Sequence, residues 1–408
     1  MMARPKVLLL ATQDTKEVEA RFLREHLTAY GCEVIHLDAS VRRTVGGAEI
    51  APEEVAGAAG KTIGEVRALG HEGKCIAVMI EGAVACALRA HAEEGLAGAL
   101  ALGGSMGTAL AGAVFQALPY GLPKLIVSTM ASGFTAPYVG RKDIAMLNAV
   151  TDISGINSIS EEVYRNAAAA VAGMAAHYEP KARAEKPLVL VGTLGTTEKC
   201  VRRVREALEE DGFEVMVFHT SGAGGPTMDS IAADREVAAV LDLSLTEMVD
   251  TLFGGLCAGG PDRGRAGLTK GVPTIVAPGN VDFIIGGPLE AAQAQFPGRR
   301  YHVHNPALTA VRTNLDDLKR IADHVAGLLA EAKGPVRVFV PLGGFSNHDS
   351  NEGHIHEPDL PAPFADYLRS VLPAGVTLET RACHFNDPEF ADAIVAATRE
   401  LVRERAPA

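Results

Sequence analysis

The fold is decided by residues 7–40, which read VLLLATQDTKEVEARFLREHLTAYGCEVIHLDAS. Residues 7–10 and 34–37 are short apolar runs without polar alternation, and such runs are typical of strands that are covered on both faces. Between them, a polar loop opens an amphipathic segment that stops at Gly31. The order strand, loop, helix, strand is the building unit of a parallel sheet covered by helices, so the stretch predicts an α/β fold.

The same unit returns 181 positions later, at residues 188–221, where 12 of the 34 aligned pairs are identical without a gap. Residues 97–102 also match residues 238–243, but here the offset has dropped to 141. Any two α/β units resemble each other to some degree, yet this number of identities favours an internal duplication. The smaller offset implies an extra segment in the first copy, which we place around residues 47–95. We expect this segment to be helical because it is rich in alanine.

Further apolar runs predict the remaining strands, at residues 99–102, 125–128, 188–191, 215–218, 240–243, 274–277 and 336–340. The polar stretch EPKARAEKP, residues 179–187, is the best candidate for a linker. We therefore predict two Rossmann-like domains with mainly parallel sheets, related by internal duplication. Residues 1–182 would form a nucleotide-binding domain, and residues 183–408 a domain on the substrate side.

Composition restricts the partners and the compartment. The 408 residues include 38 Lys and Arg and 50 Asp and Glu, so the formal charge is −12, which argues against nucleic acid and anionic membrane surfaces as partners. The apolar run near the N-terminus is too short for a signal peptide. The six cysteines are scattered without a Cys-x-x-Cys pair, as expected for reduced thiols. We expect a cytoplasmic globular protein.

The loop after the first predicted strand reads TQDTKE, residues 12–17. Ligands of open parallel sheets bind at the carboxyl ends of the strands, often against helix N-termini. Backbone amides and the ammonium group of Lys16 are suited to phosphate, and the carboxylate of Asp14 is suited to a water molecule of Mg²⁺. The alternative is a capping box, with Asp14 at the N-cap and Glu17 three residues later.

Two more loops complete the candidate nucleotide site. Residues 103–108, GGSMGT, follow a buried strand and precede a helix, so glycines and hydroxyls could cradle an anion there. A third loop, residues 128–138, is rich in hydroxyls. The Gly-Lys-Ser/Thr of a Walker loop is absent, as is the dinucleotide fingerprint after the first strand. The candidate cofactor-binding residues are Thr12, Asp14, Thr15, Lys16, Gly103, Gly104, Ser105, Gly107, Thr108, Ser132, Gly133 and Thr135.

The second half has diverged from this pattern. Its copy of the first loop, residues 193–197, lacks the aspartate and the lysine. Its copy of the glycine loop, residues 244–247, contains no glycine, and glycines instead follow the second strand, at residues 221–227. It also holds a polar set: His302, His304, Asn305, His348, Asp349, His354, His356, His384, Asn386 and Asp387. We name His304, His384 and Asp387 as candidate acid–base residues. Neutral imidazoles with carboxylates also suit a transition metal, but no ligand spacing is diagnostic, so the sequence assigns no metal.

At these residues the chain resembles a known family. The matching stretches include residues 14–16 (DTK), 103–108, 131–133 (ASG), 152–157 (DISGIN), 304–306 (HNP) and 384–388 (HFNDP). The ordered set resembles the tomato mosaic virus resistance protein-like ATP-binding domain family, and the likeness spans nearly the whole chain. It implies two α/β subdomains, ATP binding and a homodimer. It implies no particular reaction.

Three functions follow as hypotheses, and whether the protein is an enzyme stays open. The leading one is a cytosolic ATP-binding protein that acts on a small metabolite across an interdomain cleft, with Mg²⁺ if ATP is turned over. The alternatives are a metal- or acid–base-dependent hydrolase or lyase that uses the C-terminal His/Asp cluster, and an intracellular ligand sensor without turnover. A dinucleotide oxidoreductase, with Asp38 on a ribose, is weaker because the glycine fingerprint is missing.

Overall fold

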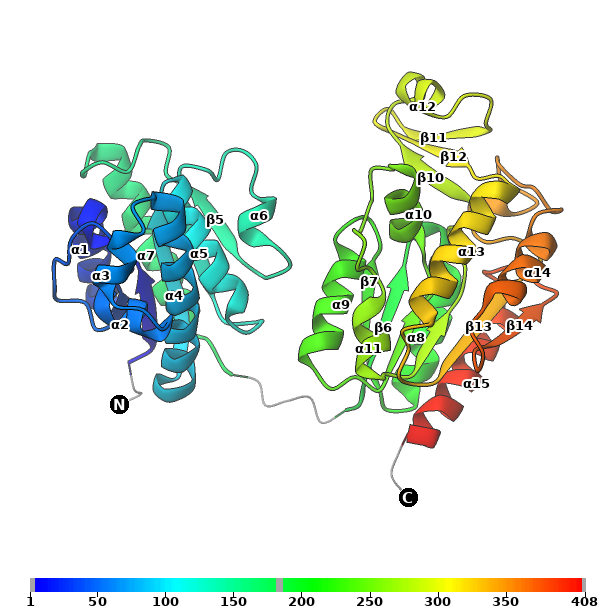
Figure 1. Cartoon of the computed structure of the whole chain (residues 1–408), viewed down its shortest axis with the longest axis horizontal. Helices are drawn as coiled ribbons and strands as arrows, with labels where there is room; N and C mark the ends of the chain where they lie inside the picture. Colours follow the sequence, from blue (N-terminus) through cyan, green and yellow to red (C-terminus); the bar gives the residue numbers. More distant parts are fainter. Residues whose placement is uncertain (1–3, 181–185, 406–408) are drawn as a thin grey trace. The chain divides into compact units, whose positions relative to one another are not determined.

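The chain divides into two compact units, Met1–Ala182 and Arg183–Ala408, and each is described by itself. The computed structural model describes residues 4–180 and 186–405 (Figure 1). The predicted linker, residues 179–187, lies in part outside them. Both units are layers of helices around a parallel sheet, so the predicted fold class is confirmed.

The first unit is built on a five-stranded parallel sheet with the order β2-β1-β3-β4-β5. The strands are β1 (Lys6–Leu10), β2 (Glu33–Leu37), β3 (Leu96–Gly103), β4 (Lys124–Ser128) and β5 (Ala145–Asn148). Helices α1 (Gln13–Ala29) and α7 (Ser158–Ala176) cover one face, and the other face meets α2 (Pro52–Ala58), α4 (Glu72–Glu94) and α5 (Ser105–Ala117). The short helices α3 (Ile63–Ala68) and α6 (Ala136–Val139) complete the unit.

The strand β1 shows why this sheet is covered on both sides. Val7 and Leu9 pack with α1 and α7, whereas Leu8 and Leu10 pack with α2, α4 and α5. All four side chains are at most 1% exposed. Side chains of a strand alternate between the two faces, so an uninterrupted apolar run is what a sheet between two helical layers requires.

The extra segment predicted around residues 47–95 is helical, as expected: it forms α2, α3 and α4. Within the described residues, α4 is the one helix long and apolar enough to cross a membrane by length and composition. Its Met79, Ala83 and Cys86 are fully buried in the core of the first unit. The packing of this helix in the core accounts for its apolar sequence.

The second unit has a six-stranded parallel sheet with the order β14-β13-β9-β8-β6-β7. The strands are β6 (Leu188–Thr193), β7 (Glu214–His219), β8 (Ala239–Asp242), β9 (Thr274–Val276), β13 (Val336–Pro341) and β14 (Thr377–Arg381). Helices α8 (Glu198–Glu210) and α15 (Pro388–Arg405) cover one face. The others are α9 (Gly224–Asp234), α10 (Thr246–Phe253), α11 (Arg265–Lys270), α13 (Leu315–Leu329) and α14 (Pro361–Val371), with 3-10 turns η1 (Gly195–Thr197) and η2 (Asn347–Asp349). The strand orders β2-β1-β3-β4 and β7-β6-β8-β9 are the same, as a duplication predicts.

A small antiparallel sheet is inserted between β9 and β13. It consists of β10 (Phe283–Gly286), β11 (Tyr301–Asn305) and β12 (Leu308–Arg312), in the order β10-β12-β11. Helix α12 (Leu289–Gln295) lies against it, and Figure 1 shows the four elements together at one end of the unit. None of the strands predicted from apolar runs falls in this insertion.

Candidate functional site

At the carboxyl edge of the first sheet, the connections from two neighbouring strands diverge to opposite faces. Strands β1 and β3 are neighbours, but the chain leaves β1 toward the α1 face and leaves β3 toward the α5 face. Ligands of open α/β sheets bind at such a switch point. The three loops predicted to bind a nucleotide follow β1, β3 and β4, so the parallel sheet brings all of them to this one edge.

The start of α5 is open toward this edge. Its N-cap is Gly104, and among the described residues no side chain accepts a hydrogen bond from the first amides of the helix. Ser105 is exposed, and Gly104 and Gly107 are half-buried. A Cβ on Gly103 would stand 2.7 Å from the backbone of Gly107, so glycine is needed for this tight turn. Free amides at the start of a helix attract anions.

Thr108, in contrast, does not face the edge. Its side chain is fully buried, and its Oγ1 donates to the carbonyl oxygen of Gly104 at 2.7 Å. The same hydroxyl lies 2.7 Å from Oγ of Ser128, at the end of β4. The hydroxyl predicted to meet a phosphate therefore ties the start of α5 to the neighbouring strand.

The start of α1 is closed by the loop after β2. The amide of Gln13 donates to Oδ1 of Asp38 at 3.0 Å, and the amide of Asp14 donates to Oγ of Ser40 at 2.9 Å. Asp38 is fully buried, and this burial raises the pKa of its carboxyl group although the hydrogen bonds oppose the shift. The first amides of α1 are thus occupied from within the protein, and a ribose has no access to Asp38.

Asp14 also has a structural partner. Its Oδ2 accepts hydrogen bonds from the amides of Val41 and Arg42, at 3.1 and 2.8 Å. The N-cap of α1 is Thr12, so the alternative interpretation, a capping box with Asp14 at the N-cap and Glu17 three residues later, is wrong. Asp14 holds a loop that carries two arginines, which the sequence analysis did not single out, and this contact leaves its Oδ2 unavailable to Mg²⁺.

Lys16 connects α1 to the loop after β5. The backbone of α1 departs from helical geometry at this residue (φ −131°, ψ 32°), and Nζ donates to the carbonyl oxygen of Ile153. One turn later, Oε1 of the buried Glu19 accepts from the amide of Gly155 at 2.7 Å. The DISGIN stretch thus packs beside α1. The two other predicted residues of this loop are Thr12 and Thr15. Thr15 is exposed, and the hydroxyl oxygens of the two residues lie 3.3 Å apart.

The loop after β4 presents Ser132 and Gly133 to solvent and leaves Thr135 half-buried. Between them, Phe134 is 73% exposed, an unusual state for a large apolar side chain. Val150 after β5 is 64% exposed, and Met106 after β3 is 37% exposed. The carboxyl edge therefore carries exposed apolar side chains, among them Met106 at the start of α5. The sequence did not indicate them, because exposure cannot be read from residue type.

In the second unit, the corresponding switch point between β6 and β8 is filled. Arg263 is 2% exposed and forms two hydrogen bonds with Asp242, at 2.8 and 2.9 Å, and one with Glu247 at 2.7 Å. A Cβ on Gly225 would lie 1.8 Å from Nε of Arg263. The glycines of residues 221–227 thus make room for a buried ion-pair cluster, and this crevice is occupied by the protein itself.

The three predicted acid–base residues do not form one group. Nε2 of His384 lies 2.9 Å from the carbonyl oxygen of Ser346, so it carries the proton, and Nδ1 accepts from the amide of Asn386 at 3.1 Å. Oδ2 of Asp387 accepts from the amide of His384 at 2.7 Å. His304 instead groups with His302 and His348 in the part of the chain that the structure describes. Burial lowers the pKa of His348 to about 4, and the neighbouring histidines add to this shift.

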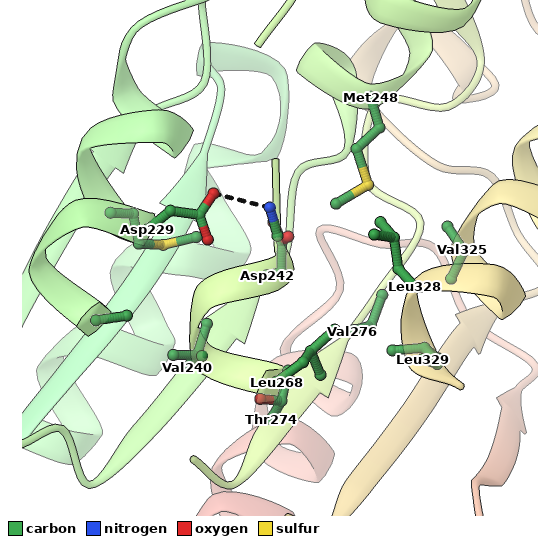
Figure 2. Close-up of a pocket in the computed structure, with 14 residues that line it drawn as sticks. Asp229, Val240, Asp242, Met248, Leu268, Thr274, Val276, Val325, Leu328 and Leu329 are labelled. Atoms are coloured by element: carbon green, nitrogen blue, oxygen red, sulfur yellow. Dashed lines mark hydrogen bonds between the residues drawn. The ribbon is translucent and has the colours of Figure 1, made fainter. Parts of the chain in front are cut away.

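A pocket inside the second unit contains none of the predicted residues. Figure 2 shows its wall of Val240, Met248, Leu268, Val276, Val325, Leu328 and Leu329, with Asp229 at one side. The carboxylate of Asp229 accepts from the amide of Gly264 at 2.8 Å, and burial raises its pKa to about 6. This is an apolar space between β8, β9 and the helices packed on them, and it offers few polar partners to a ligand.

Comparisons with known proteins cover both units. Residues 5–180 match the model of the uncharacterised protein family (UPF0261) N-terminal domain, and residues 186–402 match the model of its C-terminal domain. A UPF0261 protein of Clostridium tetani is 38% identical over 97% of this chain and 98% of its own length. A UPF0261 protein of Mesorhizobium japonicum is 34% identical over 96% and 98%.

A plant relative confirms the resemblance inferred from the motifs. The ToMV resistance protein Tm-1(GCR237) of Solanum lycopersicum is 32% identical over 97% of this chain, although the match covers 56% of the tomato protein. The chain therefore belongs to the uncharacterised protein family UPF0261 and carries both of its domains.

Proposed function

We propose that the first unit binds ATP, with the triphosphate held at the start of α5. One observation carries the proposal: at a single switch point, the start of α1 is closed by Asp38 and Ser40, whereas the start of α5 has no side-chain cap among the described residues. The first amides of a helix of 13 residues stay without internal partners unless a cap or a ligand supplies them. A phosphate group meets this need and is favoured by the helix dipole.

Cationic side chains follow β1 and β2, at the same edge of the sheet as the start of α5. Arg42 and Arg43 follow β2, are mostly exposed, and pair with Glu72 and Glu17 at 3.2 and 3.1 Å. Exposed ion pairs of this kind contribute little to stability, so these arginines can exchange their partners for a phosphate at small cost. Lys16, now bonded to a carbonyl group, adds a third cation after β1.

The exposed apolar side chains supply a surface for the base. Met106, Phe134 and Val150 follow β3, β4 and β5, which are adjacent strands, so they lie along the same edge as the start of α5. Aromatic and aliphatic side chains favour stacking of a purine ring. The choice of adenine rests on the family resemblance.

An ATP-dependent reaction on a small metabolite is the enzymatic form of this proposal, and binding without turnover is the alternative. Mg²⁺ would neutralise the charge of the triphosphate in either case. The homodimer and the cytoplasmic location stay predictions, which sedimentation and cell fractionation test.

The experiment is calorimetric titration of the full chain with ATP, ADP and NAD, with and without Mg²⁺, on the substitutions Gly104→Asp and Gly104→Asn. The backbone at Gly104 is extended, and a Cβ would meet nothing nearer than Oγ1 of Thr129 at 4.0 Å, so both side chains are accommodated. Both also cap the helix, but the aspartate adds a negative charge. We expect ATP affinity to fall at least about tenfold further in Gly104→Asp than in Gly104→Asn, equivalent to about 1.4 kcal/mol. Equal affinities in the two variants would contradict the site.

A further inference from the structure

The inserted antiparallel sheet of the second unit carries two histidines on one face. His302 and His304 are two residues apart on β11, and the pairing with β12 shifts register between Val303 and Asn305, so His304 lies at an irregularity of the strand. Their ring nitrogens nevertheless lie within 4.8 Å of each other, so both side chains are on one side of the sheet. His302 pairs with Ala310 of β12, which in turn pairs with Ile285 of β10. This row of three residues defines the face that meets the loop after β13.

The loop after β13 brings two more histidines to that face. Ile355 is fully buried against Phe283 and Ala310, so it anchors the loop on the small sheet. The ring of His348 then lies 4.5 Å from that of His302, measured between ring centroids. The ring of His354 also stacks on that of His302, with 4.7 Å between the ring centroids and 7° between the planes.

The buried carboxylate of Asp349 holds this loop in place. Its Oδ2 accepts from the amide of Phe345 at 3.3 Å, and its Oδ1 accepts from the amide of Glu357 at 3.0 Å. Nδ1 of His356 donates to the same Oδ1 at 3.2 Å, and Arg312 is paired with it at 3.4 Å. Both ends of the loop are thus tied to one carboxylate, and His348 is the residue immediately before it. These contacts fix the loop that carries His348 on the small sheet.

The ligand nitrogens already lie close together. One ring nitrogen from each of His302, His304 and His348 falls within 4.8 Å of the others. Two imidazole nitrogens that bind one tetrahedral Zn²⁺ at about 2.0–2.1 Å stand about 3.3 Å apart. Small side-chain rotations close this difference, and His304, which is exposed, is free to make them.

We propose that His302, His304 and His348 bind one divalent transition metal ion of the Zn²⁺ class, with a fourth position open to solvent. Imidazole nitrogen is a preferred ligand of Zn²⁺, Co²⁺, Ni²⁺ and Cu²⁺, and three histidines with an open position form a known coordination set for zinc. His354 does not belong to the three ligands, because its ring is stacked on that of His302. This site is separate from the nucleotide site and does not depend on it.

The test uses the tag-free full chain, stripped of metal with a chelator and then titrated with Co²⁺ and, in competition, with Zn²⁺. The variants are His304→Ala, His348→Ala and His354→Ala, with His71→Ala as a matched control, since His71 is an exposed histidine of the first unit. We expect one ion per chain, and a visible Co²⁺ absorption that Zn²⁺ removes. Because loss of a group that merely supports a ligand costs 10–100-fold in affinity, loss of a ligand in His304→Ala or His348→Ala should weaken binding at least about tenfold. His71→Ala should bind as the wild type does, and His354→Ala should lose less than the two ligand variants.

Thermal unfolding in the presence of a chelator distinguishes a variant that has lost a metal ligand from a variant that is destabilised without metal. His304 is exposed, so His304→Ala should unfold at the same Tm as the wild type without metal. Zn²⁺ should raise the Tm of the wild type but not that of His304→Ala, because an ion that binds only the folded state stabilises it. No Co²⁺ absorption in the wild type would overturn the proposal. Equal affinity in the wild type and His304→Ala, as for an adventitious ion, would overturn it as well.

Discussion

The two switch points of this protein have the same topology but opposite contents. Between β1 and β3 the first unit leaves a glycine loop and an uncapped helix start, whereas between β6 and β8 the second unit places Arg263 with Asp242 and Glu247. In the alignment of residues 97–102 with 238–243, Asp242 corresponds to Ala101. A carboxylate on the strand recruits a buried cation, and the pair fills the space in which an anionic ligand would otherwise lie. Of two switch points with the same strand order, one is filled by a buried ion-pair cluster, and the other is the one at which we propose a ligand.

The largest expected effect comes from removing the buried cation of the second unit. In Arg263→Met, the carboxylates of Asp242 and Glu247 lose their partner inside the protein. Breaking a buried ion pair from one side costs about 3–5 kcal/mol. We expect the free energy of unfolding of the second unit to fall by this amount in urea titrations.

Two control measurements show whether the loss of stability in Arg263→Met comes from the buried ion pairs of the second unit. Arg203→Ala removes an exposed pair with Asp392 and should change stability by at most about 1 kcal/mol. ATP titration of Arg263→Met should give the wild-type affinity, because the first unit is untouched. A loss of stability in Arg203→Ala as large as that in Arg263→Met would remove the contrast between the buried and exposed pairs.

Replacing a glycine by alanine should change the stability of the protein differently at the two switch points. In Gly225→Ala the new Cβ overlaps Nε of Arg263 and Oε2 of Glu247, at 1.8 and 1.9 Å. Overpacking of this kind costs about 3 kcal/mol at the upper end of the usual range. In Gly104→Ala the Cβ has room, so stability should change by less than about 0.5 kcal/mol. Chemical unfolding of both variants measures the difference, and similar losses would mean that the first crevice is as tightly filled as the second.

Buried carboxyl groups should also make the second unit sensitive to pH. Asp250 is fully buried, and this burial raises its pKa to about 7, although its oxygens accept from the amides of Cys257 and Ile285 at 2.8 and 3.0 Å. The unfolded chain releases this proton near pH 4. Between these values the folded state binds more protons, so the free energy of unfolding falls as the pH rises.

From pH 5 to pH 7 we expect this group to account for a loss of about 2 kcal/mol. Unfolding curves of the wild type and of Asp250→Asn over this range measure this loss, because the amide of the variant does not titrate. A pH dependence that is the same in both proteins would refute the assignment to Asp250.

The smallest expected effect concerns the proposed ATP site of the first unit. Removing the exposed guanidinium in Arg42→Ala should weaken ATP binding about threefold, or about 0.6 kcal/mol, since solvent and salt screen exposed charges. Arg165→Ala, which removes another exposed arginine of the first unit, serves as the control. Calorimetric titration at low and high salt should show a difference between the two variants that shrinks as salt is added. A difference that persists unchanged at high salt would speak against an electrostatic role for Arg42.

Some strands escaped the sequence analysis for a common reason. The segments AMLN of β5 and TLETR of β14 lie at sheet edges and are only half-buried, and β11 (YHVHN) is largely exposed. Their polar and apolar residues mix, so they lack the continuous apolar runs by which the central strands were recognised. Thr108 shows the same limit for a site residue: a hydroxyl in a glycine loop looks available in the sequence, but Ser128 of the next strand takes it up.

The α/β class, the internal duplication, the helical insertion and the family follow from the sequence, because they depend on local periodicity and on long runs of matched residues. Tertiary structure alone decided which helix start is open, which crevice is filled by Arg263, and which histidines meet. His302 and His348 are far apart along the chain, and a contact across such a distance is fixed by how strands and loops pack, which no local pattern records.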